Sequence, residues 1–83
     1  MTTFERVVGI LRDTLQLGSR AGALTPQSAL LGGIPEFDSM AVVTVVTMLE
    51  DELGITVDDD ELSAEVFMTV GSLVELVERK LGS

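Results

Sequence analysis

The first part of the chain alternates apolar and polar residues with a helical period. Thr2 and Glu5 form a Thr-x-x-Glu pair, which is typical of a helix-capping box, and apolar residues then recur three and four positions apart. Gly18 follows where a C-terminal cap is expected. The pattern therefore predicts a helix over residues 3–17. Its apolar stripe comprises Phe4, Val7, Val8, Leu11 and Leu15.

A second apolar segment covers residues 39–53. The six residues 42–47 are all β-branched, so propensity alone would favour a strand. However, the pattern does not alternate with period two, and the segment continues to Leu53 before Gly54 supplies a cap. We therefore predict a helix. β-Branched residues in this number cost roughly 3 kcal/mol relative to alanine, so burial must stabilise the helix, and we expect it to be the central one.

This second helix has two distinct faces when it is drawn at about 100° per residue. The inner face comprises Val42, Val45, Val46, Leu49 and Leu53. The stripe opposite comprises Met40, Thr44, Thr47 and Asp51. Met40 is thus an apolar side chain that points outward. It is either an isolated surface methionine or a soft contact for a partner protein.

Two further helices are predicted after Gly54. The acidic run 58–61 precedes apolar residues and indicates a short third helix, since the helix dipole favours acids in a first turn. A calcium-binding loop is the alternative, but the run lacks the glycine required at the sixth position. Thr69 caps the last helix, and Gly82 closes it. Its apolar stripe comprises Val70, Leu73, Val74, Val77 and Leu81.

The segment between the first two long helices, residues 18–37, is rich in glycine and proline and is predicted to be irregular. Several of its apolar residues are expected to pack into the core: Leu24, Leu30, Leu31, Ile34 and Phe37. Its length permits a crossover that would let the first two helices run parallel. The fold class is therefore all-α, a small four-helix bundle with a long loop between helices 1 and 2 and a short helix 3. Residues 1–83 are expected to form a single domain.

Composition excludes several classes of function. The chain has no Cys and no His, so it lacks disulfides, the usual metal ligands and the commonest general base. Its formal charge of −9 argues against nucleic acid and anionic lipid and for docking on basic patches of proteins. No apolar run approaches the ~20 residues that span a bilayer, and no targeting signal is visible. We expect a cytoplasmic monomer that holds no metal and does not insert into membranes.

Asp38 and Ser39 stand where the second helix begins, so either could be its N-terminal cap. A serine acts as a nucleophile in catalysis only beside a base, and the chain offers neither His nor a Ser-x-x-Lys pattern. As the acceptor of a phosphodiester Ser39 is well placed, because the positive end of the helix stabilises an anion. An enzyme that uses carboxylates alone has no paired site in this sequence.

The run Asp38-Ser39-Met40 followed by an apolar helix resembles the attachment site of acyl carrier proteins, whose usual form is Asp-Ser-Leu. The resemblance covers essentially the whole chain in length, acidity and helix order. It implies that a phosphopantetheinyl transferase attaches 4′-phosphopantetheine to Ser39, beside Asp38. The terminal thiol would then hold acyl groups as thioesters. The chain would be a non-catalytic carrier and the substrate of acyl-activating or acyl-transfer enzymes with basic docking patches.

The sequence also departs from the usual family pattern. Met40 replaces Leu, Glu36-Phe37 stands where many members have Gly and a small residue, and Thr44 and Thr47 stand where carriers of fatty acid synthesis often have acids. A specialised carrier is therefore predicted. Alternatives are a peptidyl or aminoacyl carrier, or an unmodified acidic four-helix adaptor. The predicted partner-binding residues are Glu36, Met40, Val43, Thr44, Thr47 and Asp51.

Overall fold

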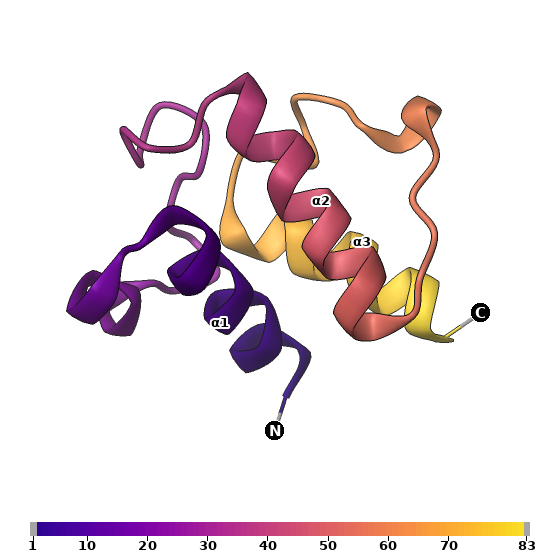
Figure 1. Cartoon of the computed structure of the whole chain (residues 1–83), viewed down its shortest axis with the longest axis horizontal. Helices are drawn as coiled ribbons and strands as arrows, with labels where there is room; N and C mark the ends of the chain where they lie inside the picture. The colour runs from indigo at the N-terminus through magenta and orange to yellow at the C-terminus, as the bar shows by residue number, and fades with distance from the viewer. Residues whose placement is uncertain (1, 83) are drawn as a thin grey trace.

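The computed structural model describes residues 2–82, and these form three α-helices and two short 3-10 helices joined by loops. In chain order the elements are α1 (Thr3–Leu15), η1 (Gly18–Ala23), α2 (Ser39–Leu53), η2 (Asp59–Glu61) and α3 (Val70–Gly82). The predicted all-α bundle, with a long loop before α2 and a short helix before α3, is confirmed (Figure 1). Within the described residues, pairing of the β type is limited to an isolated bridge between Ala29 and Thr69.

Helix α1 begins as predicted but ends earlier. Thr2 Oγ1 accepts a hydrogen bond from the Glu5 amide at 3.1 Å, and Glu5 Oε1 accepts one from the Thr2 amide at 3.1 Å, which completes the capping box. The expected end at Leu17, with Gly18 as its cap, is wrong. Gln16 adopts a left-handed conformation with φ 54° and ends the helix at Leu15. The reason is packing: the early turn directs Leu17 into the core, where it is buried.

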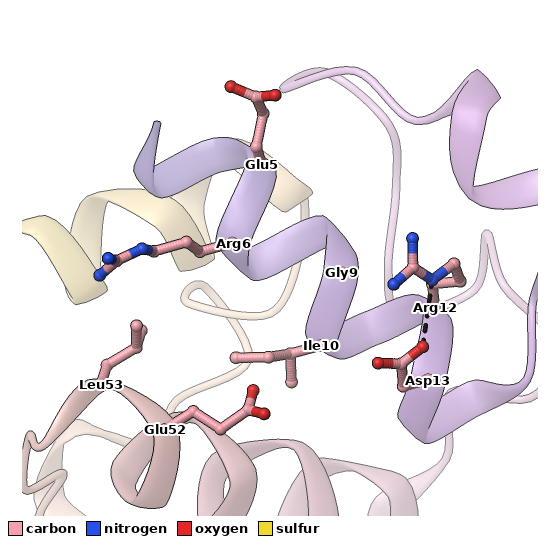
Figure 2. Close-up of a pocket in the computed structure, with 8 residues that line it drawn as sticks. All are labelled: Glu5, Arg6, Gly9, Ile10, Arg12, Asp13, Glu52 and Leu53. Carbon is pink, nitrogen blue, oxygen red and sulfur yellow. Dashed lines mark hydrogen bonds and ion pairs between the residues drawn. The ribbon is translucent and has the colours of Figure 1, made fainter. Parts of the chain in front are cut away.

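The expectation that α2 would be the central helix is also wrong. Helix α1 packs against both α2 and α3, whereas contacts between α2 and α3 are few. Moreover, α1 and α2 run antiparallel, because the start of α1 at Arg6 lies beside the end of α2 at Leu53 (Figure 2). The crossover that would have made them parallel is not formed. The loop between α1 and α2 therefore starts and ends at the same end of the bundle. Instead of crossing the bundle, it forms η1 and then pairs with the segment before α3.

Backbone hydrogen bonds tie this long loop to the start of α3. The Leu30 amide donates to the Met68 carbonyl at 2.9 Å, and the Gly71 amide donates to the Pro26 carbonyl at 2.8 Å. Gly71 permits this approach, because a Cβ there would lie 2.8 Å from the Pro26 oxygen. The predicted core residues of the loop that are buried or partly buried are Leu24, Leu30, Ile34 and Phe37. Leu31 was predicted wrongly and is 40% exposed.

The inner face of α2 matches the prediction, with Val45, Val46 and Leu49 buried and Val42 and Leu53 partly buried. The stripe of α3 is confirmed except at Leu81, which is 41% exposed because it lies in the last turn of that helix. Two buried residues lie beside the predicted stripes and were missed: Ile10 and Leu76. The apolar faces of α1 and α3 are therefore wider than the sequence pattern suggested.

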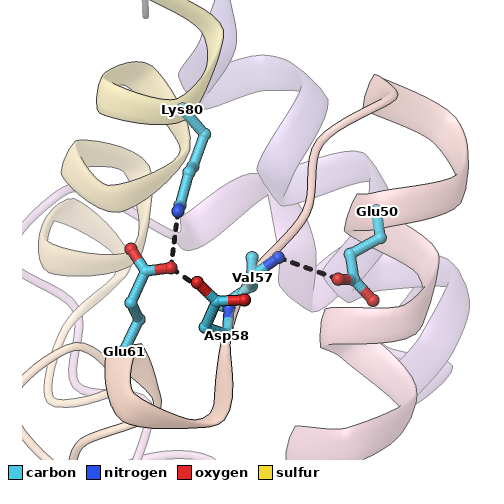
Figure 3. Close-up of polar contacts among 5 residues, drawn as sticks. All are labelled: Glu50, Val57, Asp58, Glu61 and Lys80. Carbon is cyan, nitrogen blue, oxygen red and sulfur yellow. Dashed lines mark hydrogen bonds and ion pairs between the residues drawn. The ribbon is translucent and has the colours of Figure 1, made fainter.

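The acidic segment after α2 forms a single turn, η2, with its acids in the first turn as predicted. Glu61 Oε1 accepts hydrogen bonds from Lys80 Nζ at 2.5 Å and from the Asp58 amide at 3.1 Å (Figure 3). Glu50 Oε2 accepts one from the Val57 amide at 2.8 Å. The first contact joins η2 to α3, and the last joins the preceding segment to α2. The Lys80 ammonium also holds the pKa of Glu61 below its usual value.

Thr69 caps α3 as the sequence predicts. Its hydroxyl oxygen accepts a hydrogen bond from the Ser72 amide at 3.1 Å, and Ser72 Oγ accepts one from the Thr69 amide at 3.1 Å. The Ser72 hydroxyl in turn donates to the Val66 carbonyl at 2.7 Å. These contacts fix the direction in which the segment before α3 enters the bundle.

Candidate functional site

Ser39 is the first residue of α2, and its side chain is exposed. The cap of the helix is its neighbour Asp38, which has an extended backbone and accepts a hydrogen bond from the Ala41 amide at 2.9 Å through Oδ1. The Asp38 carbonyl accepts the first helical hydrogen bond, from the Val42 amide at 3.0 Å. Both Asp38 and Ser39 were candidates for the cap, and the structure assigns it to Asp38. The Ser39 hydroxyl is therefore not needed to hold the start of the helix.

The loop just before Ser39 is anchored in the core. Phe37 is only 4% exposed, and its ring lies 5.8 Å from the ring of Phe67, measured between centroids. The Phe37 amide also donates to the Ile34 carbonyl at 2.9 Å. Since Phe37 precedes the serine by two residues and α2 follows it directly, both sides of Ser39 are held by buried structure. The exposed hydroxyl is thus presented from a fixed backbone.

The electric field at this position favours an anion. The N–H groups in the first turn of a helix have no acceptor within the helix, and the helix dipole is positive there. Before the cap Asp38, the next acid along the chain is Glu36, which is paired with Arg20 Nη2 of η1. The hydrogen bond from Arg20 lowers the pKa of Glu36. An exposed hydroxyl can form the ester bond of a phosphodiester, and free backbone donors at a helix N-terminus favour its negative charge.

The predicted partner-binding residues on α2 all lie on its exposed face. Met40 is 78% exposed and Val43 is 63% exposed. Thr44 and Thr47 are exposed too, but their hydroxyls donate back to the Met40 carbonyl at 3.2 Å and to the Val43 carbonyl at 2.9 Å. Asp51 is exposed near the far end of the helix. These residues are therefore spread along one face of α2 and do not converge on Ser39, and Glu36 lies apart from them in the loop.

Sequence reasoning missed one exposed apolar residue near this region, Met68, which is 58% exposed. Met68 directly precedes the cap Thr69, a position where an apolar residue often packs against the helix that follows. The pattern therefore contained no sign of its exposure. Leu31, which was expected in the core, is the other large apolar loop residue that is exposed within residues 2–82.

The hollow between the start of α1 and the end of α2 has a volume of about 400 Å³ (Figure 2). Its lining carries both signs of charge, with Arg6 and Arg12 from α1 and Glu52 from α2, and Arg12 Nε is paired with Asp13 Oδ1 at 3.1 Å. Ser39 is at the opposite end of α2, so this hollow is not part of the serine site. Among residues 2–82, no group of three acidic side chains is arranged to hold a metal ion.

No helix in the described part of the chain is long and apolar enough to cross a membrane. The described residues thus form a small helical fold that presents an exposed serine at the start of a helix, in a chain without histidine. The family model for the phosphopantetheine attachment site matches residues 5–77. The chain belongs to this family.

Several known proteins are similar to the chain over nearly its full length. An acyl carrier protein of Thermotoga maritima is 34% identical over 79 residues, which covers 95% of this chain and 91% of that protein. One of Saccharopolyspora erythraea is 37% identical over 73 residues, covering 88% and 72%. The solution NMR structure of a holo acyl carrier protein from Nitrosomonas europaea has a TM-score of 0.93 and 54% identity, and the match covers 100% of both chains.

The predicted membership of the acyl carrier family is thereby confirmed. The phosphopantetheine group and the function of an acyl-group carrier are confirmed with it. That Ser39 is the attachment residue stays a prediction.

Proposed function

We propose that Ser39 is the residue to which phosphopantetheine is attached, and that the chain is a substrate of partner enzymes rather than a catalyst. The observation that supports this most directly is the exposed Ser39 hydroxyl at the start of α2, next to a helix cap that is made by Asp38 alone. When bound, the group supplies a terminal thiol on which acyl groups are held as thioesters. The chain has no cysteine that could supply one.

Each residue of the site has a separate task. Ser39 Oγ forms the ester bond to phosphorus, the diphosphate bond of coenzyme A breaks, and adenosine 3′,5′-bisphosphate leaves. The serine proton passes to a base of the transferase, because this chain contains no histidine. Asp38 fixes the backbone at the start of α2. The free N–H groups of the first turn and the helix dipole stabilise the negative charge of the phosphodiester.

The pairing of Glu36 with Arg20 helps the same site. An unpaired carboxylate three residues before Ser39 would repel the phosphate, and the guanidinium offsets that charge. The outward face of α2 also supports a specialised carrier, because its middle turns present Thr44 and Thr47 instead of acids. The partners of such a carrier are the transferase and the enzymes that load or remove the acyl group.

The experiment is an intact-mass measurement of the purified apo protein after incubation with coenzyme A and a broad-specificity phosphopantetheinyl transferase. We expect one phosphopantetheinyl group on the wild type and none on Ser39→Ala. The matched controls are Ser19→Ala and Ser63→Ala, since both serines are exposed, and each variant should still gain one group. Addition to Ser39→Ala, or none to the wild type, would contradict the proposal. Circular dichroism checks that all variants are folded.

A further inference from the structure

Exposed apolar side chains gather around Ser39. Within residues 2–82, the large apolar residues most exposed are Leu31, Met40, Val43, Met68 and Leu81. The first four come from the start of α2 and from the two loop segments beside it, whereas Leu81 lies in the last turn of α3. We name Leu31, Met40, Val43 and Met68 the serine-end patch.

Contacts in the core bring the parts of this patch together. The Leu31 amide donates to the Phe67 carbonyl at 3.1 Å, so the two loop segments are paired at that point. The Phe67 ring packs against Phe37, two residues before Ser39. Figure 1 accordingly shows the segment before α3 passing beside the start of α2. Met68 therefore lies on a segment that is attached to the backbone holding Ser39, although 29 positions of sequence separate the two residues.

The charge along α2 is sharply divided. Residues 39–49 contain no ionisable side chain, and the acids begin at Glu50, followed by the exposed Asp51 and Glu52. At 1.5 Å per residue, Asp51 lies about 18 Å from Ser39 along the helix axis. In the middle of the exposed face of α2, the hydroxyls of Thr44 and Thr47 donate hydrogen bonds to carbonyls of the same helix. A partner that contacts this half of α2 therefore meets apolar groups and satisfied hydroxyls.

The proposed function decides what covers the patch. A second copy of this chain seated on Met40 and Val43 would also cover Ser39, which the modifying enzyme must reach. Anionic lipid is disfavoured by the formal charge of −9. An enzyme that acts on Ser39 must approach this surface, and exposed apolar groups of this kind mark protein interfaces.

We propose that the phosphopantetheinyl transferase that modifies Ser39 docks on the serine-end patch through an apolar, uncharged surface, and that its basic residues face only the acidic end of α2. The proposal rests on the proposed function, since it requires Ser39 to be the modified residue. It differs from docking through ion pairs along the whole helix, for which the first eleven residues of α2 offer no charged side chain.

The test compares kcat/KM for modification of the apo protein by a phosphopantetheinyl transferase, with coenzyme A saturating. We expect Met40→Ala and Met68→Ala each to lower kcat/KM about fivefold or more, because truncated anchors at the centre of an interface have effects of this size. The matched control is Leu81→Ala, an apolar residue of similar exposure to Leu31 but outside the patch, which should stay within about twofold of wild type. The losses should be the same at low salt and at about 0.5 M sodium chloride.

A second comparison tests whether the partner surface that faces the first half of α2 is uncharged or basic. Thr47→Glu adds an acid to the neutral half of α2, and we expect it to lower kcat/KM, whereas a basic partner surface would raise it. Its control is Thr56→Glu, which adds the same charge at an exposed position after α2 and should have little effect. Thermal melting checks that each variant is folded. If Met68→Ala does not fold, Val43→Ser takes its place.

Each outcome separates the two proposals. If the wild type is modified at Ser39 and the patch variants react at the wild-type rate, or Thr47→Glu reacts faster, the docking proposal is overturned and the attachment site stands. If the wild type is not modified at Ser39, the proposed function fails and the docking proposal fails with it.

Discussion

The two ends of α2 are built in opposite ways. At the serine end a side chain, Asp38, caps the helix, the following turns are uncharged, and apolar groups are exposed. At the other end a glycine, Gly54, ends the helix in a left-handed conformation with φ 65°, and three consecutive acids precede it. Glu50 is tied to the Val57 amide at 2.8 Å, so the acidic end is also attached to the next segment (Figure 3).

The helix dipole makes this arrangement informative. Acids near the C-terminal end of a helix are disfavoured by roughly 0.3–1 kcal/mol each at low salt, whereas an anion at the N-terminal end is favoured by a similar amount. Beyond its cap Asp38, α2 has no acid in its first turn, and its three acids, Glu50, Asp51 and Glu52, stand at the unfavourable end. This distribution does not maximise the stability of the protein by itself. It is explained if the favourable end is kept for a phosphate on Ser39 and the acidic end for a basic partner.

The largest expected effect concerns the core that supports both ends. Leu49 is 1% exposed on the inner face of α2, so Leu49→Ala should lower the free energy of unfolding by about 2–5 kcal/mol through lost burial and a residual cavity. The matched variant Thr47→Ala, on the outer face, should change it by about 0.5 kcal/mol or less. Urea unfolding measures both. Equal losses would show that the two faces of α2 are not distinct.

A smaller effect should separate the two ends of the helix directly. Asp38→Ala removes the cap and should cost about 0.5–2 kcal/mol, whereas Ser39→Ala should cost less than about 0.5 kcal/mol because Ser39 is not the cap. Asp51→Ala, at the other end, should be neutral or stabilising by roughly 0.3–1 kcal/mol at low salt. Thermal and urea unfolding of the three variants measure the change in the free energy of unfolding for each. A loss at Ser39→Ala as large as at Asp38→Ala would contradict it.

The smallest effect concerns two ion pairs, Glu36 with Arg20 near the serine end and Glu61 with Lys80 near the acidic end. Hydrogen bonds from these cations hold the pKa of each carboxyl below the reference value of 4.5. A lowered pKa in the folded state means that the stabilisation is fully present above the unfolded pKa and is lost as the pH falls through the folded one. Acid should therefore weaken both pairs.

Melting curves from neutral pH down to about pH 3 test this. Glu36→Gln and Glu61→Gln should lower the midpoint near neutral pH, and each should approach the wild-type curve as the pH falls. The Glu61 variant should have the larger effect, because its pair is less exposed, at 25% and 30% against 54% and 38%. Glu65→Gln, an exposed carboxyl, is the control. A difference in melting midpoint between variant and wild type that grows as the pH falls would contradict the predicted pH dependence.

Much of the fold followed from local patterns. The capping box at Thr2, the cap at Thr69 and the inner face of α2 were predictable, because helical period and capping chemistry involve residues at most a few positions apart. The junction of Asp38 with Ser39 was visible for the same reason. The β-branched residues of α2 did not mislead the prediction, since the period of the pattern outweighed their propensity.

The sequence by itself thus determined where the three α-helices and η2 lie, which face of α2 is buried and which serine stands at its start, but it did not predict η1, which lies in the segment expected to be irregular. Only the tertiary structure decided that α1 is central and antiparallel to α2, that α1 already ends at Leu15, and that Arg20 neutralises Glu36. It also decided that Met68 is exposed on a segment held beside the start of α2. These features depend on residues far apart in the chain, and their energies arise only when packing brings the segments together, so no local period or motif encodes them.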